Sequence, residues 1–191
     1  MEVAILTGLF GGMVGLLGGG IAVFNSYMGV RWKRAELANS YMKDFNANAE
    51  LVFAGRCLDW NGGKLALPDS LQPYMPDGAK IIEHDKDIYY RSINPILKLD
   101  ELNGDPRLQI YRTSIDTFLS WLALVGSAVD RGIFRIQDIE DVAYWVSKIE
   151  SEPKVLAFIK SFGYESGFRK LRVQCRTRNS NYRDWRFLPW R

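Results

Sequence analysis

Histidine and cysteine are scarce in this chain of 191 residues, which contains one His and two Cys. The scarcity excludes the zinc signatures built from paired cysteines, because Cys57 and Cys175 are far apart. A thiol nucleophile would have only His84 as its base. The sequence also lacks a nucleophile elbow and a phosphate-binding glycine loop. We therefore expect a protein that is not an enzyme, with no cofactor, no metal and two reduced thiols.

Charge is absent from residues 3–24, where fourteen residues are apolar, seven are glycine and one is Thr7. A helix of this length covers about 30 Å, the thickness of the hydrocarbon core of a bilayer. The basic residues Arg31, Lys33 and Arg34 follow the stretch, an order that places the N-terminus outside and the rest of the chain in the cytoplasm. The stretch therefore predicts a single-pass transmembrane anchor at residues 1–30, in a bacterial inner membrane or its equivalent.

Two alternatives to this anchor are weaker. A cleaved signal peptide normally begins with positive charge, whereas this chain begins Met1-Glu2. A buried core helix normally has a polar face, which residues 3–24 lack. The flank after the stretch has the composition of a membrane interface, where aromatic and basic side chains gather. The predicted interfacial anchors are Tyr27, Arg31, Trp32, Lys33 and Arg34.

Glycines recur through the same stretch at spacings of three and four residues, which places them on neighbouring strips of one helix. Small residues at this spacing let a second helix approach closely, as in a glycine zipper. Glycine is also common in transmembrane helices, which is the plainer explanation. We expect packing against other membrane helices, in a homo- or hetero-oligomer. The residues of the predicted contact are Gly8, Gly11, Gly12, Gly15, Gly18 and Gly19.

Residues 31–178 have the length and composition of one folded domain. The predicted class is all-α, a cytoplasmic helical bundle with at most one small β-hairpin, formed by residues 64–67 and 80–83. The clearest element is a central helix from Asp105-Pro106 to Gly132, whose apolar residues alternate at spacings of three and four. Those residues are Leu108, Tyr111, Ile115, Phe118, Leu122, Val125 and Val129. The N-terminal helix is predicted to continue through Arg31 to about Phe45, and further helices are predicted at residues 49–60, from 87, at 139–149, 155–162 and 168–176.

Two short polar strings could carry chemistry. His84 lies between Glu83 and Asp85, but neighbours on an extended segment point to opposite sides, so the string predicts a solvated polar turn rather than a metal site. Arg56 and Asp59 are three residues apart on a predicted helix and can form an ion pair across one turn. We interpret both strings as structural.

Basic charge is concentrated at the C-terminus. Residues 168–191 contain eight Lys/Arg and one Asp, a net charge of +7, which leaves −4 for the rest of a chain whose total is +3. The tail, residues 179–191, mixes arginine with aromatic residues, a composition enriched at protein interfaces and at anionic ligands. We favour protein docking over an anionic lipid surface, and both over nucleic acid, for which the tail is a small footprint, and over folding back on the chain's own domain. The docking residues are Arg176, Arg178, Tyr182, Arg183, Trp185, Arg186, Trp190 and Arg191.

These features favour a non-catalytic accessory, assembly or scaffold subunit of a membrane protein complex. The alternative is a membrane-tethered sensor or effector that oligomerises through its span and binds nucleic acid or lipid with its tail. An enzyme that uses the His84 cluster is the third hypothesis.

Overall fold

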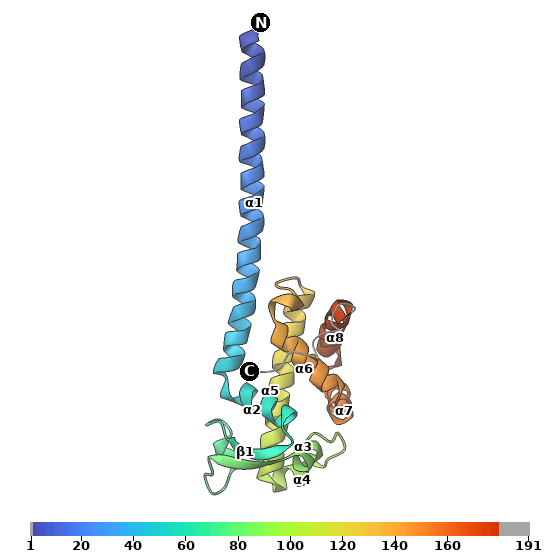
Figure 1. The fold of residues 1–191 in the computed structure, drawn as a ribbon. Helices are drawn as coiled ribbons and strands as arrows, with labels where there is room; N and C mark the ends of the chain where they lie inside the picture. Colours follow the sequence, from blue (N-terminus) through green and yellow to red (C-terminus); the bar gives the residue numbers. More distant parts are fainter. Residues whose placement is uncertain (1, 180–191) are drawn as a thin grey trace.

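The computed structural model describes the backbone of residues 2–179 and the side chains of residues 22–139 and 141–176. A long N-terminal helix projects from a body of shorter helices and one hairpin (Figure 1). In chain order the elements are α1 (Glu2–Ala47), α2 (Ala49–Asp59), β1 (Gly62–Ala66), the 3₁₀-helix η1 (Gln72–Tyr74), β2 (Ile81–Asp85), α3 (Lys86–Ser92), α4 (Leu99–Gly104), α5 (Pro106–Asp130), the 3₁₀-helix η2 (Ile136–Asp138), α6 (Glu140–Glu150), α7 (Pro153–Ser161) and α8 (Glu165–Asn179).

Helix α1 is unbroken over its 46 residues and is therefore about 69 Å long. The prediction that the N-terminal helix continues through Arg31 to about Phe45 is confirmed. Helix α1 ends where Asn48 begins α2, because the Asn48 side chain accepts hydrogen bonds from the backbone N–H groups of Glu50 and Leu51, at 3.0 and 3.2 Å.

The prediction of a membrane span is corrected by the structure. Over the residues that it describes, no helix combines the length and the apolar character needed to cross a bilayer. The described side chains of α1, residues 22–47, include charged residues at six positions, which gives this part of the helix a polar surface. The predictions of a single-pass anchor, an outside N-terminus and a cytoplasmic domain therefore lack support. The side chains of residues 2–21 lie outside the described residues.

Helix α5 is the centre of the body, and all seven apolar residues of its predicted seam are buried. Its first turn is stabilised by Asp105, whose side chain accepts from the N–H of Arg107 at 2.9 Å, and by Pro106 at the first helical position. After α5 the chain reverses at Gly132, where φ is +69°, a conformation that favours glycine. The predicted central helix is confirmed.

The remaining helices pack around α5, and the hairpin lies at the end where α5 begins (Figure 1). Strands β1 and β2 are antiparallel, with Lys64 opposite Glu83, so the small hairpin is confirmed as well. Helix α8 approaches α5 closely because both carry glycine at the contact. A Cβ atom placed on Gly126 would lie 2.7 Å from the carbonyl oxygen of Gly167. The described body is thus a mostly helical bundle with a two-stranded sheet.

Helix α4 was not predicted. It is six residues long, with no residue buried, and its N-terminal residue Lys98 makes no side-chain cap. A helix this short and exposed leaves no apolar spacing in the sequence. Helix α8 also starts three residues earlier than predicted, at Glu165.

Candidate interaction site on helix α1

The part of α1 that precedes the core presents apolar side chains to solvent. Ala38 is the first described residue of α1 that is buried, and we call residues 2–37 the α1 arm. The described part of the arm exposes Val23 (71%), Phe24 (62%), Tyr27 (62%), Val30 (48%) and Trp32 (71%). A run of exposed large apolar residues on one element is typical of an interaction surface.

Val23, Tyr27 and Val30 continue the side of α1 that packs on the body, whereas Trp32 lies on the opposite side of the helix. Val23, Val30 and Leu37 are seven residues apart, which places them on nearly the same side of a helix. Tyr41, four residues after Leu37, lies on this side too, and its ring meets the ring of Phe134 at a centroid distance of 5.1 Å. The same apolar side is therefore covered where the body lies beside α1 and open where the body ends.

The structure separates the five predicted interfacial anchors into two groups. Tyr27, Arg31 and Arg34 line a groove between α1 and η2. Trp32 and Lys33 do not line that groove and are exposed. The six glycines of the predicted helix contact lie in residues 2–21, outside the described side chains, so this contact stays a prediction.

Only the beginning of the predicted docking tail lies within the described side chains. Arg176 forms an ion pair with Glu150 at 3.1 Å, and Arg172 pairs with the same carboxylate. Part of the basic charge at the C-terminus therefore neutralises the domain's own surface. Arg178 and the remaining docking residues, Tyr182, Arg183, Trp185, Arg186, Trp190 and Arg191, lie outside the described side chains.

His84 is a buried structural residue, and the prediction of a solvated turn is wrong. Its side chain is 3% exposed, whereas the neighbouring Glu83 and Asp85 are exposed, as expected for a strand. The Nε2–H group donates to the carbonyl oxygen of Trp60 at 3.0 Å, so Nδ1 is the acceptor for the Tyr111 hydroxyl, also at 3.0 Å. Burial lowers the pKa of His84, which keeps the ring neutral.

Tyr111 completes this network, since its hydroxyl also accepts from the backbone N–H of Asp85 at 3.3 Å. The network ties β2 to α5 and to the end of α2 with every hydrogen bond satisfied. Among the residues whose side chains are described, no group of three or more His, Cys, Asp or Glu could hold a metal ion. The arrangement supports folding and offers no proton to a substrate, because His84 is inaccessible.

Cys57 is fully buried in the core, and Lys86 lies beside it. Burial raises the pKa of the Cys57 thiol well above its ordinary range, so the thiol stays protonated. The Lys86 ammonium group donates to the carbonyl oxygens of Cys57 and Leu58, at 3.2 and 2.6 Å. Cys57 is therefore a small apolar core residue, as predicted.

The predicted ion pair between Arg56 and Asp59 does not form. Asp59 instead accepts a hydrogen bond from the Tyr144 hydroxyl and pairs with Lys148 at 3.6 Å, which joins α2 to α6. Arg56 lies 5.8 Å from the centre of the Trp60 ring, a cation–π contact on the same helix end. Long-range partners on α6 thus replace the local pair.

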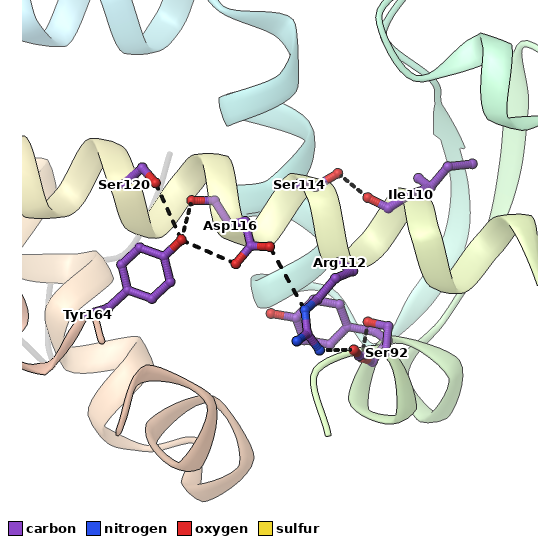
Figure 2. Close-up of polar contacts among 8 residues, drawn as sticks. Ser92, Ile110, Arg112, Ser114, Asp116, Ser120 and Tyr164 are labelled. Atoms are coloured by element: carbon purple, nitrogen blue, oxygen red, sulfur yellow. Dashed lines mark hydrogen bonds and ion pairs between the residues drawn. The ribbon is translucent and has the colours of Figure 1, made fainter. Parts of the chain in front are cut away.

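Sequence reasoning missed one polar cluster on α5, shown in Figure 2. Arg112 donates to the backbone carbonyl of Ser92 at 2.9 Å, and its Nε lies 3.9 Å from Asp116. The Tyr164 hydroxyl, from the loop before α8, donates to Asp116 at 3.2 Å. Burial raises the pKa of Asp116, and the Arg112 charge partly offsets the rise.

The guanidinium group of Arg112 also lies over two rings of α7 and the turn after it, with distances of 4.4 Å to Phe158 and 4.1 Å to Phe162. The cluster therefore connects α3, α5, α7 and the loop before α8. The spacing of Arg112 and Asp116, four residues apart on one helix, was the available signal. Its contacts are all internal, so we assign it to the stability of the body.

Comparisons of the chain with family models, with curated proteins and with solved structures gave no match.

Proposed function

We propose that this chain is a non-catalytic accessory or scaffold subunit of a protein complex, which docks through the α1 arm onto an apolar helix of a partner subunit. The observation that carries the proposal is the exposure of Val23, Tyr27 and Val30 on the side of α1 that is covered further along the same helix. Burying these side chains against a partner would remove apolar area from water, at about 25 cal/mol per Å².

The sequence of the arm favours a helix as the partner element. Glycine at positions 8, 12, 15 and 19 follows the spacing of a helix contact, and Val23 comes four residues after the last of them. Small residues at this spacing allow the backbones of two helices to approach closely. Over residues 3–30 the arm also carries no charge, so the partner surface is expected to be apolar rather than acidic or basic.

The body suits a docking role because its polar groups serve the fold. The His84 network, the Asp59 contacts and the Arg112 cluster are each satisfied by internal partners. A helical body of this kind holds an arm in a fixed direction, since α1 runs into the core without a break.

Native mass spectrometry of the full chain, isolated gently from its own source, tests the proposal. We expect co-isolation with partner subunits at fixed stoichiometry, and loss of the partners in a Gly15→Leu variant. Ala35→Leu is the matched control, because Ala35 is an exposed residue of α1 and, five residues after Val30, lies off the proposed contact side. A lone monomer, or an unchanged complex in Gly15→Leu, would contradict the proposal.

A further inference from the structure

A small groove with basic walls opens where the α1 arm meets the body. It lies between α1 and η2 and has a volume of about 210 Å³. Pockets for drug-sized ligands enclose about 300–1,000 Å³, so this groove fits a smaller guest. Its lining consists of Tyr27, Val30, Arg31, Arg34, Arg135, Gln137 and Asp138.

Three arginines, Arg31, Arg34 and Arg135, line this groove. Among the side chains that the structure describes, none of the three forms an ion pair. The one carboxylate of the lining, Asp138, accepts the backbone N–H of Arg135 at 2.8 Å. The groove therefore keeps a net charge of about two positive units, as expected for always-protonated guanidinium groups.

The fold brings these charges together from distant parts of the sequence. Arg31 and Arg34 are three residues apart and share one side of α1. Arg135 directly precedes η2, which packs beside α1. Like charges at such spacing oppose folding, so their convergence at a groove points to a bound anion.

We propose that this groove is a binding site for a phosphate group. Planar guanidinium groups match phosphate oxygens in pairs of parallel hydrogen bonds, and the groove offers three of them from two elements. The Gln137 amide and the Tyr27 hydroxyl add neutral donors to the same lining. The net charge matches a phosphate dianion, and the volume accommodates one phosphate or two linked phosphates.

This site shares Tyr27 and Val30 with the docking side of the α1 arm, but it differs from that side because its ligand is an anion and its walls include η2. A phosphate group can come from a free phosphate compound or from a lipid headgroup, and both would use the same arginines. The test therefore has one binding experiment for each source.

The first experiment measures binding of inorganic pyrophosphate to the full chain by calorimetry. The test variant is Arg34→Gln combined with Arg135→Gln. The matched control is Arg107→Gln, at the opposite end of the body, where Arg107 pairs with Asp105 at 3.6 Å. We expect the affinity to fall at least about tenfold in the double variant, as for lost hydrogen bonds to a charged group, and less than about twofold in the control.

The second experiment measures binding of the full chain to phosphatidylcholine vesicles with and without phosphatidic acid. Arginine-dependent binding to pyrophosphate assigns the site to free phosphate compounds. Arginine-dependent binding to phosphatidic acid vesicles alone assigns it to lipid headgroups. Binding that survives in the double variant, or no binding in either experiment, would overturn the proposal. Thermal unfolding of each variant confirms that it is folded.

Discussion

The α1 arm and the rest of α1, residues 38–47, belong to one helix but have opposite surroundings. In residues 38–47, Ala38 and Phe45 are buried, and the Phe45 ring lies 4.8 Å from that of Trp121. In the described part of the arm, Val23 and Tyr27 are more than half exposed. Val23, Val30 and Leu37 lie on the same side as Tyr41, with Arg34 among them, so the difference comes from where the body ends. Exposed apolar residues that extend beyond the core on one helix are typical of an interaction surface.

Truncating a side chain at the centre of the body should have the largest effect on stability. Phe118 is fully buried and meets Phe45 and Trp145 at ring distances of 6.2 and 5.4 Å. Phe118→Ala should lower the free energy of unfolding by about 3–5 kcal/mol. Val23→Ala on the arm should change it by less than about 0.5 kcal/mol. Urea unfolding measures both, and equal losses would show that the arm is part of the core.

A methyl group added to a glycine gives a second contrast between body and arm. Gly126→Ala should destabilise by about 1–3 kcal/mol, because the new Cβ would meet the backbone oxygen of Gly167. Gly29→Ala has open space and gains about 1 kcal/mol of helix propensity, so no loss is expected. Thermal unfolding compares the pair. Tolerance of Gly126→Ala would mean that α5 and α8 are not in close contact.

Removing one tyrosine hydroxyl from the body or from the arm extends the comparison of these two regions to polar groups. Tyr111→Phe leaves His84 Nδ1 and the Asp85 N–H without a partner, which should cost about 1–3 kcal/mol. Tyr27→Phe, at an exposed arm position, should cost less than about 0.5 kcal/mol. Chemical unfolding of the two variants measures these changes in the free energy of unfolding. An unchanged free energy in Tyr111→Phe would contradict the buried network.

The smallest expected effect is a pH dependence carried by His84. Its pKa is lower in the folded chain than the ordinary value of about 6.5, so the unfolded chain binds more protons in that range. Stability should therefore fall as the pH drops below about 6.5. Unfolding curves at pH 7 and pH 5 should show a smaller difference in His84→Gln, which lacks this titration. An identical difference in both proteins would show that His84 does not contribute.

Local patterns predicted most of the body. The seam of α5 is buried because spacings of three and four residues are set within the helix itself, and the hairpin follows from short strands bounded by turn residues. Partners distant in sequence were not predictable. Tyr111 lies 27 residues from His84, and Tyr144 lies 85 residues from Asp59, so neither contact leaves a local signal.

The candidate sites show the same division between features that local patterns predicted and contacts between residues distant in sequence. The exposed apolar side of the arm was visible as an uncharged stretch, but hydropathy led to a membrane span that the described helices do not support. Arg31 and Arg34 were noticed for their charge, whereas Arg135 was not, since only the packing of η2 beside α1 brings the three together.

Hydrogen exchange of the backbone amides of α1 is the most direct test of the account. In the isolated chain, amides of residues 22–33 should exchange much faster than those of residues 38–47, which lie against the core. In the complex isolated from its own source, residues 22–33 should become protected while residues 38–47 change little. Equal exchange of residues 22–33 in the isolated chain and in the complex would contradict docking through the α1 arm.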